Sequence, residues 1–137
     1  MNKILVDTNI LIYSIDEDSK YFKFSQDILL NKDFDLYTTS KNLTEFLAVI
    51  TRLPNASLSL DQAIELTHDF SSIMTVLYPT INSYQIFLDL LKKYNPTGLK
   101  IHDFEIMSTG IAHGVYTIAT INKKDFEQVT EINIYNK

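Results

Sequence analysis

Oxygen-bearing side chains recur at the predicted turns between strands and helices, where they could act together on one ligand. The candidates are Asp7, Glu45, Asp103, Asn122 and Asp125. Carboxylates held together at neutral pH repel one another, so such a cluster persists when protons or cations neutralise it. Because the chain has no cysteine and no pair of histidines at metal-ligand spacing, an oxygen-only set favours Mg²⁺ or Mn²⁺ over zinc. Hard ions held by acids are suited to phosphodiester hydrolysis, since they deprotonate a water and stabilise charge on phosphate.

Alternating strands and helices are predicted to position these side chains. The β-branched, apolar run at 3–6 predicts a strand buried on both faces, and Asp7 ends it. Further short strands are predicted over 36–39, 75–78, 115–121 and 132–135. Helices are predicted from residue 9 or 10, over 21–29, from Asn42 to the turn at Pro54 and Asn55, over 60–74, 83–94 and 103–113, with one turn at 122–127. Strands that alternate with helices through short loops indicate an α/β fold with a mostly parallel sheet.

The predicted sheet brings the candidate acids to one edge. In an open parallel sheet, ligands bind beyond the carboxyl ends of the strands. Asp7 closes the first strand, Glu45 lies one turn into the helix after the second, and Asn122 and Asp125 follow the fourth. Asp103 begins the helix that leads into the fourth strand. We therefore expect these residues, far apart in sequence, to lie close in space.

Helix capping is the alternative role for each of these residues. Asp7 and Asp103 are good N-cap residues, while Asn42 with Glu45, and Asn122 with Asp125, have the spacing of a capping box. Two features favour a cluster instead. Glu45 stands beside apolar residues, and Asp7 ends a run that should be buried, where acids are rarely left unpaired.

Composition limits the class of protein. The 137 residues include 12 basic and 17 acidic ones, for a net charge of -5, so the generic electrostatic attraction of a nucleic-acid binder is missing. The absence of cysteine excludes disulfide scaffolds and thiol chemistry and is compatible with a reducing cytoplasm. Neither a secretion signal nor a membrane span fits the N-terminal pattern. We expect one cytoplasmic domain over 1–137 with no membrane partner.

Four ordered sequence blocks resemble the PIN domain family of metal-dependent ribonucleases, which includes the VapC-like toxins of toxin–antitoxin pairs. The blocks are 6–13 (VDTNILIY), 40–46 (SKNLTEF), 101–112 (IHDFEIMSTGIA) and 120–126 (TINKKDF). The chain length matches a stand-alone member from end to end. The resemblance implies a three-layer α/β/α sandwich around a central, mostly parallel sheet.

The resemblance also assigns roles to residues. Asp7, Glu45 and Asp103 match the family's three principal acids, whereas Asn122 stands where many members carry a fourth acid. The implied catalytic set is therefore Asp7, Glu45, Asp103 and Asn122, and the implied metal ligands are Asp7, Asp103, Asn122 and Asp125. Asn122 supplies one ligand charge less, which argues against a second tightly held metal.

Substrate contacts are predicted around the same edge. Thr8 and Thr120 match positions where family members often place a hydroxyl near the metal or the scissile phosphate. Asn9 either joins them or braces its loop as a cap. Lysines should contact phosphates, because Arg52 is the only arginine, and Lys123 is the assigned contact, with Lys100 and Lys124 also flanking the site. Metal ions would then recruit the polyanion locally despite the negative net charge.

The leading hypothesis is a Mg²⁺- or Mn²⁺-dependent endoribonuclease acting on RNA. The resemblance implies the toxin of a type II toxin–antitoxin pair, an antitoxin partner and a homodimer. An apolar groove for an antitoxin segment is expected between the first helix and the helices around Phe46 and Leu60. The alternative is a catalytically degenerate PIN-like binding module, suggested by Asn122. A phosphate-binding receiver domain needs an acid at the end of the third strand, where Tyr78, Pro79 and Thr80 offer none.

Overall fold

A five-stranded parallel sheet forms the centre of the molecule. The computed structural model describes residues 2–54 and 57–136, and the strands within them run in the order β3-β2-β1-β4-β5. Their bounds are β1 (Asn2–Val6), β2 (Phe34–Thr39), β3 (Thr75–Leu77), β4 (Thr117–Ala119) and β5 (Asn133–Ile134). All four strand pairings are parallel. The predicted sheet is confirmed, although β4 and β5 are shorter than the apolar runs that predict them.

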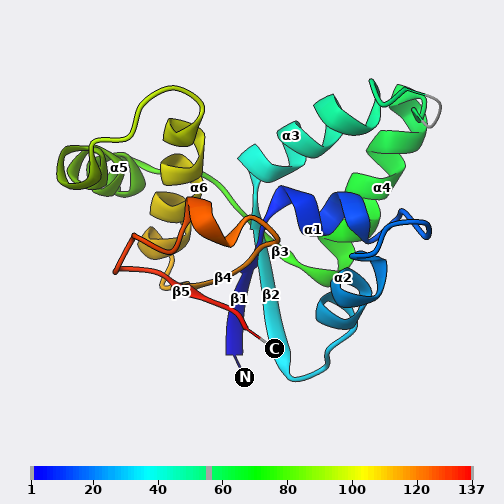
Figure 1. Ribbon diagram of the computed structural model, residues 1–137, viewed down its shortest axis with the longest axis horizontal. Helices are drawn as coiled ribbons and strands as arrows, with labels where there is room; N and C mark the ends of the chain where they lie inside the picture. Colours follow the sequence, from blue (N-terminus) through cyan, green and yellow to red (C-terminus); the bar gives the residue numbers. More distant parts are fainter. Residues whose placement is uncertain (1, 55–56, 137) are drawn as a thin grey trace.

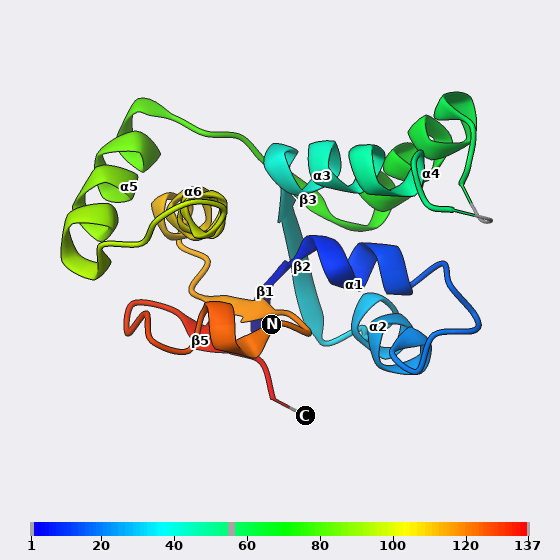
Figure 2. The same ribbon diagram turned by 45° about the horizontal axis from the view of Figure 1, so that its top comes forward.

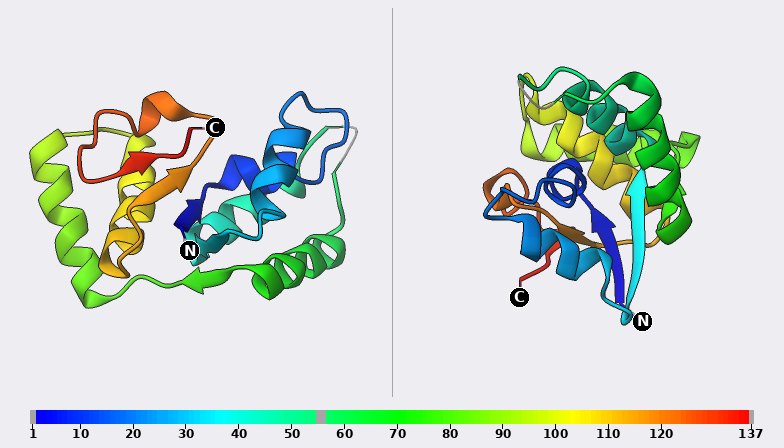
Figure 3. Two further views of the ribbon diagram at one scale, coloured as in Figure 1. Left: turned by 90° about the horizontal axis from the view of Figure 1, so that it is seen from below. Right: turned by 90° about the vertical axis from the view of Figure 1, so that its right-hand side faces the viewer.

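Helices cover both faces of this sheet (Figure 1). They are α1 (Thr8–Tyr13), α2 (Phe22–Leu29), α3 (Ser40–Ile50), α4 (Leu60–Ile73), α5 (Ile81–Tyr94) and α6 (Lys100–Ala112), and a short 3-10 helix, η1 (Lys123–Asp125), follows β4. Helices α1 to α4 gather on one side of the sheet, and α5 and α6 lie on the other (Figures 2 and 3). The three-layer α/β/α sandwich is confirmed. No helix in the described residues is long and apolar enough to span a membrane.

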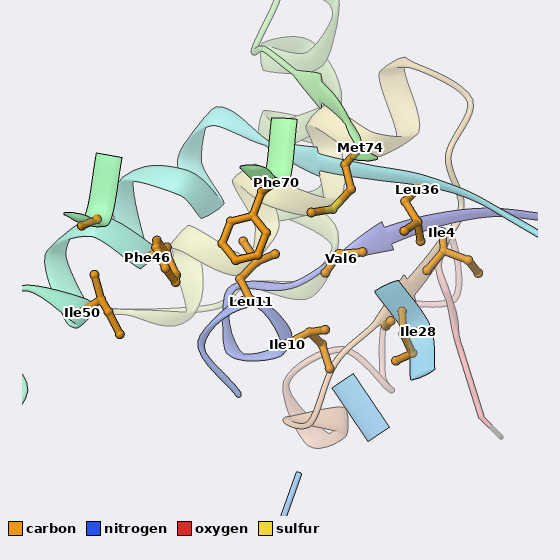
Figure 4. Close-up of a cluster of buried hydrophobic side chains, with 12 residues drawn as sticks. Ile4, Val6, Ile10, Leu11, Ile28, Leu36, Phe46, Ile50, Phe70 and Met74 are labelled. Carbon is orange, nitrogen blue, oxygen red and sulfur yellow. The ribbon is translucent and has the colours of Figure 1, made fainter. Parts of the chain in front are cut away.

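Strand β1 is buried on both faces, as its β-branched, apolar sequence predicts. Ile4 and Val6 point into the core beneath α1 to α4, together with Ile10 and Phe46 (Figure 4). Leu5 points to the opposite face, where it belongs to the core beneath α5 and α6. Both cores are therefore organised around alternate residues of a single central strand.

The chain direction creates a switch point at the carboxyl end of β1. The chain moves outward from β1 to β2 and β3, then returns through α5 and α6 to β4, on the other side of β1. Leu5 is in register with Tyr37 of β2 and with Ile118 of β4. Ligands of open α/β sheets bind where neighbouring connections diverge in this way. The residues after β1 and β4 therefore flank the expected binding crevice.

Two capping predictions are wrong because the helices begin elsewhere. Helix α3 starts at Ser40, with Thr39 as its N-cap and Asn42 at the third helical position. Asn42 is therefore not the N-cap of a capping box with Glu45. Helix α6 starts at Lys100, since Ile101 N already donates to Gly98 O at 3.1 Å, and Asp103 lies within its first turn. Asn122 is the N-cap residue of η1, as predicted, but its side chain makes no capping hydrogen bond.

The remaining cap and turn predictions have mixed outcomes. Asp7 is the N-cap of α1 and accepts a hydrogen bond from Thr8 N, as predicted. Helix α3 ends at Ile50, before the predicted turn at Pro54. The second residue of that turn, Asn55, lies outside the described residues.

Candidate active site

Asp7 occupies the centre of the site because it follows β1, the middle strand. Its backbone N–H donates to Ala119 O of β4 at 3.0 Å, which extends the ladder past the end of the strand. Its side chain is only 6% exposed. Thr120 Oγ1 donates to Asp7 Oδ2 at 2.7 Å, and Thr8 N donates to Asp7 Oδ1 at 2.9 Å. Asp7 is thus both a helix cap and the buried acid of the predicted cluster.

Asn42 is a residue at this site that the sequence analysis did not identify as such. It is fully buried, and its Nδ2 donates to Thr8 Oγ1 at 3.0 Å and, more weakly, to Asp7 Oδ1 at 3.4 Å. Its Oδ1 accepts from the backbone N and the hydroxyl of Thr39, at 3.1 and 2.7 Å. The capping box that starts α3 therefore orients the β1 carboxylate. A Thr-x-x-Asn sequence at the end of a strand was the available signal.

Asn9 braces the two neighbouring strand ends. Its Nδ2 donates to Asp7 Oδ2 at 3.3 Å and to Thr120 Oγ1 at 3.2 Å, while its Oδ1 accepts from Ile121 N at 3.1 Å. Every polar atom of its side chain therefore has a protein partner. The contacts support the bracing alternative for Asn9, and they make Thr120 a partner of Asp7 across 113 residues of sequence.

Glu45 brings a second carboxylate towards the same space from α3. Within the part of the chain that the structure describes, its Oε1 is buried and has no hydrogen-bond partner. Burial raises the pKa of Glu45, and the negative charge of Asp7 raises it further, against the opposing positive charge of Lys41. A buried carboxylate oxygen without a donor is costly, so Glu45 is suited to receive a cation or to accept a proton.

Asp103 lies in the first turn of α6, on the other side of the sheet from α3. Burial, followed by the charges of Asp7, Asp125 and Glu45, raises the pKa of Asp103 from 3.8 to about 7. Burial also raises the pKa of Asp7, against the hydrogen bond from Thr120, and Asp125 adds to the rise. The four carboxylates of Asp7, Glu45, Asp103 and Asp125 are here called the acid cluster. They come from four separate segments, and each of the other three repels Asp103.

The acid cluster suits a divalent cation by its chemistry. It offers carboxylate oxygens, one of them without a partner, and raised pKa values mark the unrelieved charge that a cation would neutralise. As the side chains stand, no three Asp, Glu or His residues among those described are close enough to enclose one ion. The donor types match Mg²⁺ or Mn²⁺, so the chemistry of the acids fits such an ion whereas their present spacing does not.

Two predicted residues lie at the rim. Asn122 is exposed, and its backbone N–H donates to Thr120 Oγ1 at 3.1 Å. Lys123 is also exposed, and its Nζ donates to Asn136 Oδ1 at 2.8 Å. The structure therefore places both at the end of β4, with the lysine amine bound to the C-terminal segment.

Comparisons with known proteins agree with this geometry. The chain matches the PIN domain family over residues 4–132. No match was found among curated proteins. Its fold resembles VapBC2 from Rickettsia felis, solved on a DNA fragment from its promoter, with a TM-score of 0.73, 19% identity and 98% of each chain covered.

Two other solved structures show the same similarity. DNA-bound VapBC from Salmonella typhimurium has a TM-score of 0.69 and 25% identity, with 98% of each chain covered. VapC20 from Mycobacterium tuberculosis, a toxin that cleaves the sarcin–ricin loop, has a TM-score of 0.73 and 12% identity, covering 92% of this chain and 95% of that one. The family match over nearly the whole sequence and the shared three-layer fold lead to one conclusion: this chain belongs to the PIN domain family and has the fold of VapC toxins.

Proposed function

We propose that the protein is a divalent-metal-dependent endoribonuclease and the toxin of a type II toxin–antitoxin pair. The observation that carries the proposal is the acid cluster, in which the charges of Asp7, Glu45 and Asp125 all act on Asp103 and burial leaves a Glu45 oxygen unpartnered. Such a site is unfavourable until a cation enters it. Membership of the PIN family and the RNA-cleaving activity in the name of VapC20 support RNA as the substrate.

Each acid has a role that follows from its position. Asp7 and Asp103, on opposite sides of the crevice, would hold Mg²⁺ or Mn²⁺, with Asn122 and Asp125 completing the ligand set. When bound, the ion supplies an acidified water and neutralises charge developing on the phosphate. Glu45, whose pKa burial already raises, would orient the attacking water and accept its proton.

The hydroxyl and amide groups around Asp7 act by holding that carboxylate in place. Thr120 and Asn9 fix one of its oxygens, and Thr8 N fixes the other. Since the hydroxyl of Thr120 donates to Asp7 and accepts from Asn9 Nδ2 and from Asn122 N, this residue is a positioning residue in the proposed reaction. Lys123 would approach phosphate only by releasing Asn136.

RNA cleavage by purified protein, free of any partner, tests the proposal. Single-stranded and structured RNAs are incubated with Mg²⁺, Mn²⁺ or EDTA, using native protein and the Asp7→Asn and Asp103→Asn variants. The proposal expects cleavage that needs metal and is lost in both variants, while circular dichroism shows that they remain folded. Cleavage that survives both substitutions would refute the assigned site.

An apolar groove offers a binding site for the antitoxin. The groove lies between α1, α3 and α4, has a volume of about 250 Å³, and is lined by Ile12, Ile15, Asp16, Ile50, Leu53, Leu58 and Leu66. It matches the position predicted from the sequence and suits an amphipathic helix, which binds through apolar anchors. The relatives solved as VapBC complexes support this assignment.

A charge placed in the groove tests the partner. Leu66→Glu should abolish co-purification with an antitoxin encoded beside the gene, and RNA cleavage should persist, because the groove is separate from the acid cluster. Retained co-purification would show that the antitoxin binds elsewhere. A homodimer and a cytoplasmic location complete the proposal, and light scattering of the purified protein measures the former.

The second candidate is a binding module that has lost catalysis. Asn122, in place of an acid, and the loose arrangement of the acid cluster favour it. Isothermal titration calorimetry separates the two candidates, because a module without catalysis need not bind Mn²⁺, whereas the nuclease must. Heat of binding that disappears in Asp103→Asn would favour the nuclease.

A further inference from the structure

A cavity borders the acid cluster at Asp125, is not lined by Asp7, Glu45 or Asp103, and has no assigned ligand. Its volume is about 530 Å³, and its wall comes from the end of α5, the loop at 95–99, the start of α6 and the segment around η1. It shares Asp125 with the acid cluster, and Lys100 and Phe104 on its wall flank Asp103 in sequence. Its size lies within the range of small-ligand sites. A group bound there would therefore lie next to the reacting phosphate.

Two amines give the cavity a charge that suits phosphate. Lys100 and Lys124 both line it and are exposed, and neither makes an ion pair within the described residues. Lys100 lies in the first turn of α6, three residues before Asp103. Unpaired amines next to an acidic metal site can bind the backbone on either side of a scissile phosphate.

Apolar and amide groups on the same wall suit a base. Leu99 stands on the rim with 83% of its surface exposed, and Phe104 forms part of the wall. Asn95 and Gln128 add amide donors and acceptors. Unpaired bases are recognised by apolar or aromatic contact with their faces and by hydrogen bonds to their edges.

The wall is held rigid by a cluster of side chains. Tyr94 Oη donates to Glu131 Oε1 at 2.5 Å, and Thr130 N donates to Tyr94 Oη at 3.0 Å. Lys93 Nζ donates to the other oxygen of Glu131 at 2.8 Å. The end of α5 is thereby fixed to the segment before β5, on the far side of the cavity. A fixed wall reduces the entropy cost of binding a ligand.

We propose that this cavity binds the nucleotide next to the scissile phosphate of a single-stranded RNA, with its base against Leu99 and Phe104 and its phosphates near Lys100 and Lys124. The inference rests on the proposed ribonuclease function and names a substrate subsite for it. A protein segment is the other conceivable occupant. The mixture of amines and amides fits RNA better, whereas the apolar α1–α3–α4 groove suits a peptide.

Binding of short single-stranded oligoribonucleotides tests the subsite apart from catalysis. Affinity is measured in Ca²⁺ by fluorescence anisotropy, with intact RNA confirmed on a gel, for a series in which one base at a time is replaced by an abasic residue. One position should weaken binding to native protein by about fivefold or more, the lower range for loss of one stacked base. In Leu99→Ala the loss at that position should shrink, because the base contact is already gone.

The two lysines are tested by salt dependence. Lys100→Ala combined with Lys124→Ala should weaken binding of every oligonucleotide and reduce the slope of log K against log salt by about 1.4, from two contacts of about 0.7 each on a single strand. Lys3→Ala combined with Lys32→Ala is the matched control, because it removes the same charge at the opposite end of the sheet. The control should leave the slope near the native value.

The outcomes separate the subsite from the nuclease. The subsite would be overturned, even if RNA is cleaved, by two results together. An abasic replacement would weaken binding equally in native and Leu99→Ala protein, and the double lysine variant would leave the salt slope unchanged. A cavity that binds a protein segment would give these results. If the abasic loss shrinks in Leu99→Ala but the native protein cleaves no RNA with any metal, the nuclease proposal is overturned and the binding of a nucleotide in the cavity is upheld. Failure of native protein to bind any oligonucleotide would overturn both.

Discussion

Replacing Asp103 with asparagine should stabilise the metal-free protein while abolishing its proposed activity. Burial and three neighbouring acids raise the pKa of Asp103 from 3.8 to about 7. At neutral pH the folded protein therefore holds a carboxylate that the unfolded chain accommodates more easily. Asparagine has nearly the same shape without the charge, so the substitution removes the repulsion from the folded state.

The pH dependence has a definite direction. Below about pH 4 Asp103 is protonated in both the folded and the unfolded chain, and between about pH 4 and pH 7 only the folded chain keeps the proton. The free energy of unfolding of native metal-free protein should therefore fall as the pH rises through this window. Asp103→Asn should lack the part of this fall that Asp103 contributes, so its advantage over native protein should be absent near pH 4 and largest at pH 7 and above.

The size of the effect is limited by solvent. The difference between the two pKa values corresponds to about 4 kcal/mol at 1.36 kcal/mol per pH unit. Because Asp103 is only half-buried, water and salt screen its charge, and a gain of about 1–2 kcal/mol at pH 7 is expected. In a domain of this size that gain raises Tm by about 3–8 °C.

Urea unfolding in EDTA, followed by circular dichroism, measures the free energy of unfolding of native protein and Asp103→Asn. The measurements are made at about pH 4.5, 6 and 7.5, which span the titration of Asp103. The matched control is Asp89→Asn on the exposed surface of α5, which should leave the pH profile of native protein unchanged. Lower stability of Asp103→Asn at the highest pH, or a native profile flat across the window, would show that the four acids do not share one confined space.

Three further changes test other parts of the structure. Asn42→Ala should lower the free energy of unfolding by about 2–3 kcal/mol in urea titrations, because it leaves several buried hydrogen-bonding groups without a partner; a loss below about 0.5 kcal/mol, the low end for one hydrogen bond, would contradict these contacts. Mn²⁺ should raise Tm of native protein in a concentration-dependent way but not that of Asp7→Asn, measured by differential scanning fluorimetry, and an equal rise in both would place the ion elsewhere. Gly110→Ala should destabilise the protein by about 1–3 kcal/mol, since its Cβ would lie 3.0 Å from Leu5 Cδ2 and 3.2 Å from Val115 O; unchanged urea midpoints would mean that the core gives way without cost.

Much of the fold follows from local patterns in the sequence. The apolar run before Asp7 predicts a central strand because both of its faces must be buried. Ser59 and Gln62 predict the start of α4, and the structure confirms their capping box. Gly114, with φ of 76°, stops α6 as predicted, since a left-handed residue ends a helix at low cost when it is glycine.

Acids at strand ends were also predictable, whereas their partners were not. A parallel sheet brings the ends of its strands to one edge, which is why Asp7, Glu45 and Asp103 could be grouped from sequence alone. The sequence does not show that the Asn42 side chain donates to Thr8 and Asp7, because helix capping is already a sufficient reason for an asparagine at this position. The predicted capping box of Asn42 with Glu45 is wrong because the N-cap of α3 is Thr39, which is also the last residue of β2.

The sequence by itself determined the type of sheet and the identity of the acids, since hydrophobic periodicity and residue chemistry are local properties. Only the tertiary structure decided that Asn9 connects Asp7 with Thr120, that Glu45 keeps an unpartnered oxygen, and that a cavity opens beside Asp103. The contacts with Thr120 join segments more than 100 residues apart, and the cavity and the Glu45 environment also depend on the directions of side chains from separate elements. Packing of the whole chain sets such directions, and no short stretch of sequence encodes them.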